Sequence, residues 1–93
     1  MKPRFLVRAR QEIADPSTYY ASENLQLRDD LEHEIERALA HLCAFPLAGK
    51  PIEASYRSYK LRRFPYCLIY WPESDEIVIT AFAHTARQPG YWR

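Results

Sequence analysis

The stretch LQLRDDLEHEIERALAHLCA, residues 25–44, carries the clearest structural pattern in the chain. Its leucines and isoleucine recur at spacings of four and three, and most of the positions between them are charged or polar; the apolar positions are Leu27, Leu31, Ile35, Leu39 and Leu42. A repeat near 3.6 residues puts these side chains on one face, which predicts an amphipathic helix about 30 Å long. Asn24 is the expected N-cap. Phe45 is the expected end, because a residue before proline is disfavoured in the α region.

The chain before this helix predicts a strand and then a shorter helix. In residues 4–10, alternate positions form one apolar side, Phe5, Val7 and Ala9, while Leu6 lies between Arg4 and Arg8 on the other side. This alternation is typical of a half-buried strand. Residues 11–22 have helical character but are interrupted by Pro16. Proline in a helix interior loses a hydrogen bond and clashes with the preceding turn. We therefore expect the helix either to begin at Pro16, with Asp15 as its N-cap, or to be kinked there.

The chain after the long helix predicts a loop and three strands. Residues 47–51 contain Gly49 and end in a proline, which indicates a loop. Strand-like runs rich in tyrosine, isoleucine, valine and phenylalanine follow at residues 54–61, 66–71 and 77–84. The last run is apolar on both faces, so we expect it to be central in the sheet. The order β-α-α-β-β-β predicts an α+β fold in which two N-terminal helices, the second one long, pack on a small antiparallel sheet.

Composition sets limits on the domain and its location. A chain of 93 residues with 47% hydrophobic and 27% charged residues suits one compact domain, residues 1–93. There is no signal-peptide pattern and no apolar run of membrane length, so we expect a cytoplasmic protein that does not engage a membrane. Cys43 and Cys67 form no C-x-x-C pair, which favours reduced thiols in a core over a disulfide or a zinc site.

The charge of the chain is unevenly distributed. The formal net charge is +1, but residues 47–93 hold seven Lys/Arg against four Asp/Glu, whereas residues 1–46 hold six against eight. The second half is therefore the one expected to meet an acidic or anionic partner. The whole-chain charge is modest compared with that of proteins that live on nucleic acid.

Several groups of residues together resemble the RelE/ParE toxin superfamily along nearly the whole chain. They are Tyr19-Tyr20, the end of the long helix with Phe45-Pro46, Arg62-Arg63-Phe64-Pro65-Tyr66, and His84-x-x-Arg87-x-Pro89-Gly90-Tyr91-Trp92. The resemblance implies the toxin of a type II toxin–antitoxin system, a growth inhibitor of the kind associated with plasmid stabilization. It also implies a cognate antitoxin that holds the toxin inactive in a hetero-oligomer.

Two activities occur in this superfamily. RelE-like members cleave messenger RNA at the ribosome, whereas ParE-like members inhibit DNA gyrase with no known reaction of their own. Metal-independent RNA cleavage needs a base, an acid and cations around the phosphate. The candidates are Lys60 or His84 as base, Tyr91 as acid, and Arg62, Arg63 and Arg87 as phosphate ligands.

RelE-like nucleases look more basic and carry further Lys, Glu or His groups that have no counterpart here. We therefore expect a ParE-like gyrase inhibitor, and we lean against an enzyme. The alternative is a RelE-like ribosome-dependent endoribonuclease. A second alternative is a degenerate, non-toxic member that only binds antitoxin.

The residues expected to bind target or antitoxin are Arg57, Arg62, Arg63, His84, Arg87, Tyr91 and Trp92. Each also has an ordinary structural interpretation. Arginines beside a turn are often solvated, a histidine at a strand end often hydrogen-bonds the tail, and C-terminal aromatic residues often clasp the core. The expected partners are an acidic, amphipathic antitoxin segment and either gyrase or ribosome-bound message. DNA would be reached only through the antitoxin.

We expect neither a cofactor nor a metal. The two glycines of the chain, Gly49 and Gly90, make no phosphate-cradling loop. His33 and Glu34 lack the second histidine of a zinc-binding H-E-x-x-H motif.

Overall fold

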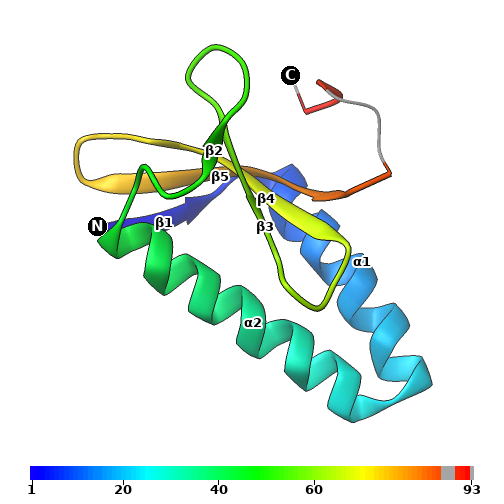
Figure 1. Cartoon of the computed structure of the whole chain (residues 1–93). Helices are drawn as coiled ribbons and strands as arrows, with labels where there is room; N and C mark the ends of the chain where they lie inside the picture. The colour runs from blue at the N-terminus through cyan, green and yellow to red at the C-terminus, as the bar shows by residue number, and fades with distance from the viewer. Residues whose placement is uncertain (87–89, 93) are drawn as a thin grey trace.

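Two helices cover one side of a five-stranded sheet, and residues 90–92 lie on the other side (Figure 1). The computed structural model describes residues 1–86 and 90–92. Its elements are β1 (Lys2–Phe5), α1 (Val7–Glu23), α2 (Leu25–Ala44), β2 (Lys50–Pro51), β3 (Arg57–Lys60), β4 (Tyr66–Pro72) and β5 (Glu76–His84). This arrangement confirms the α+β fold class and the two N-terminal helices.

The sheet has the order β1-β5-β4-β3-β2 and is mixed. Strands β3, β4 and β5 pair antiparallel, as predicted, and β2 pairs antiparallel with β3. The expectation of a purely antiparallel sheet was wrong for β1, which pairs with β5 in parallel. Parallel strands need a long connection between them, and the two helices and the other three strands form that connection between β1 and β5. Strand β5 therefore lies between β1 and β4, and it is buried from Ile77 to Ala83, as expected of a central strand. Its register with β4 shifts between Ile69 and Tyr70, which leaves Thr80 as the extra residue of a bulge.

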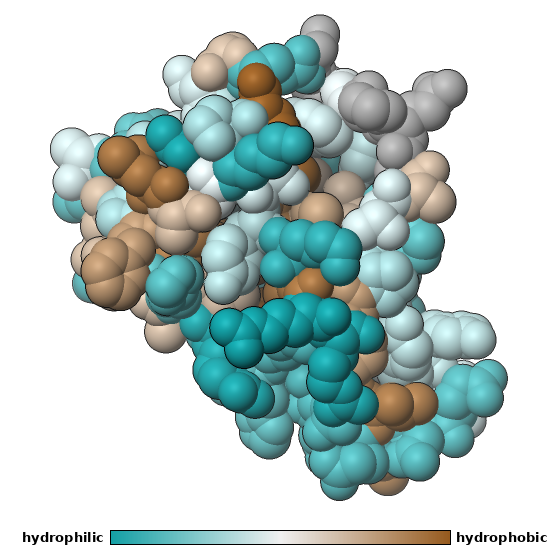
Figure 2. All heavy atoms as spheres, in the orientation of Figure 1, coloured by the Kyte–Doolittle hydropathy of each residue, from teal (hydrophilic) through white to brown (hydrophobic). Residues whose placement is uncertain are grey.

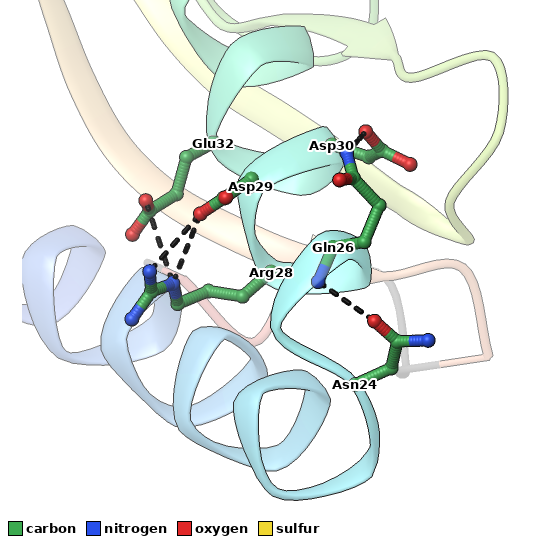
Figure 3. Close-up of polar contacts among 6 residues, drawn as sticks. All are labelled: Asn24, Gln26, Arg28, Asp29, Asp30 and Glu32. Atoms are coloured by element: carbon green, nitrogen blue, oxygen red, sulfur yellow. Dashed lines mark hydrogen bonds and ion pairs between the residues drawn. The ribbon is translucent and has the colours of Figure 1, made fainter.

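Helix α2 begins and ends where the sequence predicts. The Asn24 side chain accepts a hydrogen bond of 2.7 Å from the backbone N–H of Gln26 (Figure 3). At the other end, Phe45 is the C-cap. The buried face carries Leu31, Ile35, Ala38 and Leu42. Polar residues occupy the other faces; in the first turns Arg28 pairs with Asp29 and Glu32, as Figure 3 shows. Local capping and the apolar stripe therefore fix this helix.

The predictions for the first elements were wrong in their boundaries. Strand β1 ends at Phe5, and α1 begins at Val7 and continues through Pro16. The alternation read as a strand belongs partly to a helix: Val7 is 72% exposed, whereas Ala9 is fully buried in the core. Pro16 is itself buried. Packing of α1 against α2 and β5 evidently offsets the roughly 3 kcal/mol that proline costs inside a helix.

The segment around β2 also differs from the prediction. Lys50 and Pro51, expected in a loop, pair with Ser58 and Arg57 of β3. The strand expected at residues 54–61 is shorter, because the chain turns at Ala54, whose φ is 50°, and β3 begins only at Arg57. A two-residue strand shows no alternation, so its sequence carries no signal.

Tyr70 of β4 joins the end of α2 to the sheet. Its side chain is fully buried, its hydroxyl donates a hydrogen bond of 2.8 Å to the carbonyl of Pro46, and it accepts one of 2.9 Å from the N–H of Gly49. A Cβ on Gly49 would lie 2.5 Å from this hydroxyl oxygen, so only glycine fits there without a shift. The loop after α2 is thus held directly against the core.

Burial raises the pKa of Tyr70, and burial together with the neighbouring Tyr20 raises the pKa of Tyr66. Below about pH 10 both residues are protonated in the folded and unfolded chains. Above it the unfolded chain ionises first, so the free energy of unfolding should fall as pH rises from about 10 toward the folded-state pKa values. Denaturant unfolding across this range should show the fall, and Tyr70→Phe should make it shallower. An identical pH profile in this variant would contradict the role of Tyr70.

Cys43 and Cys67 are free and half-buried, in agreement with the prediction of reduced thiols. Cys43 packs beside the helix-side core, and Cys67 beside the smaller apolar cluster on the opposite face of the sheet. No helix in the described residues is long and apolar enough to cross a membrane.

Candidate partner-binding site

Helix α2 and the turn between β3 and β4 enclose a hollow of about 410 Å³ that we call the basic hollow. It gathers three of the residues predicted from the sequence, Lys60, Arg62 and Arg63. Its full lining is Glu34, Arg37, Ala38, His41, Tyr59, Lys60, Leu61, Arg62 and Arg63. Residues far apart in the sequence therefore build one surface that is rich in cations.

Glu34 sets the position of one wall against the other. Its carboxylate accepts hydrogen bonds from the backbone N–H groups of Arg62 and Arg63, the latter at 3.3 Å. The carboxylate of Glu34 thus stabilises the β3–β4 turn through charge-assisted hydrogen bonds. The two arginine side chains project from a turn that is fixed to α2.

The cations of the basic hollow differ in how they are engaged. Arg63 donates a hydrogen bond of 3.0 Å to Asp30 and lies 5.5 Å from the centre of the Phe64 ring. Hydrogen bonds from Gln26 and from Arg63 lower the pKa of Asp30, which keeps that carboxylate ionised; the contact with Gln26 is drawn in Figure 3. Lys60 donates to the carbonyl of Leu61 at 3.3 Å.

Arg37 and Arg62 have no carboxylate within ion-pair distance among residues 1–86 and 90–92. His41 lies beside them, with its ring 5.2 Å from the Phe45 ring and 5.7 Å from the Tyr59 ring. The hollow therefore offers two available guanidinium groups next to an aromatic wall. Such groups bind carboxylates and phosphates in bidentate geometry.

Sequence reasoning missed Glu34, Arg37 and His41 as members of a site. They lie at i, i+3 and i+7 on α2, together with Ala38, which places them on one face of the helix. That spacing was visible in the sequence. The pairing of this face with the β3–β4 turn was not.

Tyr91 and Trp92, also predicted from the sequence, lie elsewhere, on the side of the sheet away from the helices. Trp92 is only 9% exposed and packs against Ile69, Ala81 and Ala83. The Tyr91 hydroxyl donates a hydrogen bond of 2.6 Å to Glu12 of α1, and the other oxygen of Glu12 accepts one of 3.0 Å from the N–H of Phe82. Glu12, which the sequence did not single out, therefore ties the C-terminal segment to α1 and to β5.

Two further predicted residues, His84 and Arg57, are separate from both places. His84 accepts a hydrogen bond of 3.0 Å on Nδ1 from the N–H of Ala86, and its ring lies against Tyr66. Arg57 donates to the carbonyls of Leu47 and Gly49, at 3.2 and 2.8 Å, and so holds the loop after α2. Arg87 lies outside the described residues.

Within the part of the chain that the structure describes, no three histidine, cysteine or carboxylate side chains come together as a metal site would require. The chemistry available in the basic hollow is that of cations and aromatic rings. This is the chemistry of binding an acidic group.

Comparison with known proteins places the chain in a family. The family model described as "ParE toxin of type II toxin-antitoxin system, parDE" matches residues 4–89. A chain of the solved structure titled "Chromosomal ParDE TA system from P. aeruginosa" superposes with a TM-score of 0.75 at 19% sequence identity, covering 90% of this chain and 95% of that one. No curated protein matches the sequence.

Proposed function

Since this chain belongs to the ParE toxin family of type II toxin–antitoxin systems, we propose that it arrests growth by binding a target such as DNA gyrase. A cognate antitoxin neutralises it by forming a complex. The protein acts in the cytoplasm as a single toxin domain spanning residues 1–93. It reaches DNA only through the antitoxin.

The family match over residues 4–89 is the observation that carries this proposal. It begins within β1 and spans both helices, the other four strands and the basic hollow. The solved ParDE structure supports the same fold, and its title implies an antitoxin partner for the toxin chain. A hollow with available guanidinium groups suits a function based on binding a protein partner.

The positions of the candidate catalytic groups favour binding over RNA cleavage. His84 is engaged on Nδ1 by the backbone of its own turn, and the ammonium of Lys60 by the carbonyl of Leu61. The Tyr91 hydroxyl is held by Glu12 on another element. A base and an acid for attack by a 2′-OH need to converge on one phosphate. These three groups instead support separate parts of the fold.

The proposal is tested by inducing the protein in cells that lack the antitoxin and in cells that also make it. Growth should stop within the first generations in cells that make the toxin alone. It should continue in cells that also make the antitoxin and in cells with the empty vector. Purified gyrase should lose supercoiling activity on addition of the protein, while messenger RNA stays intact.

The alternatives give different results in the same experiment. Codon-phased cuts in translated messages, with normal supercoiling, would identify a RelE-like endoribonuclease and refute the gyrase target. Unchanged growth in cells that accumulate the folded protein would refute toxicity altogether. That result would favour a member that only binds antitoxin.

A further inference from the structure

Another surface hollow among the described residues has nearly the same volume as the basic hollow, and charge distinguishes the two. The second, of about 400 Å³, lies between α1 and α2 and is lined by Phe5, Arg10, Ile13, Glu32, Ile35 and Glu36. Its one arginine faces two glutamates and lies over the Phe5 ring at 5.0 Å. The basic hollow holds one lysine, three arginines and a histidine with the single carboxylate of Glu34. The volumes therefore do not distinguish the two hollows, whereas the excess of cationic side chains makes the basic hollow the better candidate for binding an acidic group.

We propose that the basic hollow binds the carboxylates of an acidic, amphipathic segment of a protein partner. In the function proposed above, that partner is the antitoxin, and the identity of the partner rests on that proposal. Arg37 on α2 and Arg62 on the β3–β4 turn stand on opposite walls and hold the carboxylates between them. The carboxylate of Glu34 does not compete for the two guanidinium groups, because it accepts hydrogen bonds from the backbone N–H groups of Arg62 and Arg63.

Exposed apolar side chains beside the hollow account for the amphipathic character of the segment. Phe45 is 61% exposed, and its ring lies against His41 in the hollow. Leu47, two residues further along the chain, is 67% exposed. A segment whose acidic side chains enter the hollow can cover these two residues with its apolar ones. The combination of cations and neighbouring apolar surface suits a peptide better than a simple anion.

The charge of helix α2 as a whole argues against a nucleic acid. Asp30 already pairs with Arg63, while Glu32 and Glu36 of the same helix line the second hollow, and the whole chain carries only +1. Figure 2 shows hydrophilic side chains spread across the face on which α2 lies. A long run of phosphates would approach these carboxylates and be repelled, whereas a short acidic segment can place its charges locally.

The test uses a labelled synthetic peptide in which glutamate and leucine alternate, with a glutamine-for-glutamate peptide as its control. The wild-type protein should bind the glutamate peptide, more weakly as salt rises, and should bind the glutamine peptide far less. The double variant Arg37→Ala/Arg62→Ala should weaken binding by about tenfold to a hundredfold. Arg10→Ala, which removes the arginine of the second hollow, should change it by less than about twofold.

Unchanged melting temperatures would show that the variants fold. Equal binding by the double variant and the wild type, or equal binding of the two peptides, would overturn the proposal. Stronger competition by a single-stranded oligonucleotide than by unlabelled glutamate peptide would overturn it in favour of a phosphate site.

Peptide binding does not depend on toxicity, so the two proposals fail separately. Growth arrest without peptide binding would refute the basic hollow and leave the toxin standing. Peptide binding lost in the double variant, in a protein that never arrests growth, would support the hollow and refute the toxin.

Discussion

Replacement of Tyr70 with alanine is expected to lower the free energy of unfolding by about 3 to 5 kcal/mol. Tyr70 is the largest of the fully buried side chains, and its removal leaves a cavity between α2 and the sheet. It also removes the partner of Gly49 N–H and of the Pro46 carbonyl. Chemical denaturation followed by circular dichroism measures the loss.

A second variant separates packing from hydrogen bonding. Tyr70→Phe keeps the ring and should cost about 1 to 3 kcal/mol, because the buried N–H of Gly49 loses its acceptor. Tyr19→Phe is the matched control: Tyr19 is 60% exposed, so its hydroxyl should contribute less than about 0.5 kcal/mol. If both tyrosine-to-phenylalanine variants were equally stable, the Tyr70 hydroxyl would have no structural role.

Replacement of Glu12 with alanine is expected to cost about 1.5 to 3 kcal/mol and to release the C-terminal segment. The carboxylate accepts from both Phe82 N–H and the Tyr91 hydroxyl, and hydrogen bonds to a charged acceptor are stronger than neutral ones. With the link lost, the indole of Trp92 should become exposed. Glu12→Gln retains an acceptor oxygen and should lose only part of the stability.

Tryptophan fluorescence reads out the release directly. In a Trp71→Phe background, emission from Trp92 should shift to the red and become open to acrylamide quenching in Glu12→Ala. Glu23→Ala is the control, because Glu23 is an exposed residue at the end of the same helix. If acrylamide quenched Trp92 equally in the Trp71→Phe parent, in Glu12→Ala and in Glu23→Ala, apolar packing would hold the C-terminal residues in place without Glu12.

The elements that local sequence specifies were predicted well. Helix α2 matches residue for residue because its apolar stripe, its Asn24 cap and the proline after Phe45 are all local signals. Strand β1 and helix α1 were misplaced because their boundary depends on tertiary contacts. Seven alternating residues suit either a strand or the start of a helix, and the burial of Ala9 decides between them.

The candidate site was predicted only in part, for a similar reason. Lys60, Arg62 and Arg63 stand out as a basic run beside a turn, and the structure places them together. Their partners on α2 lie within an acidic helix and are joined to them only by folding. The bonds of Glu12 to Phe82 and Tyr91 span 70 and 79 residues, a distance that no local pattern records.

The parallel pairing of β1 with β5 bears on how this protein emerges from the ribosome. In the sheet as described, the neighbour of the first strand is the last strand, which ends at His84. The residues of β1 leave the exit tunnel before those of β5, so they must wait for more than seventy further residues before they can pair. A nascent chain interrupted before β5 therefore has no complete sheet, and the fold of this domain cannot close until the residues up to His84 have been made.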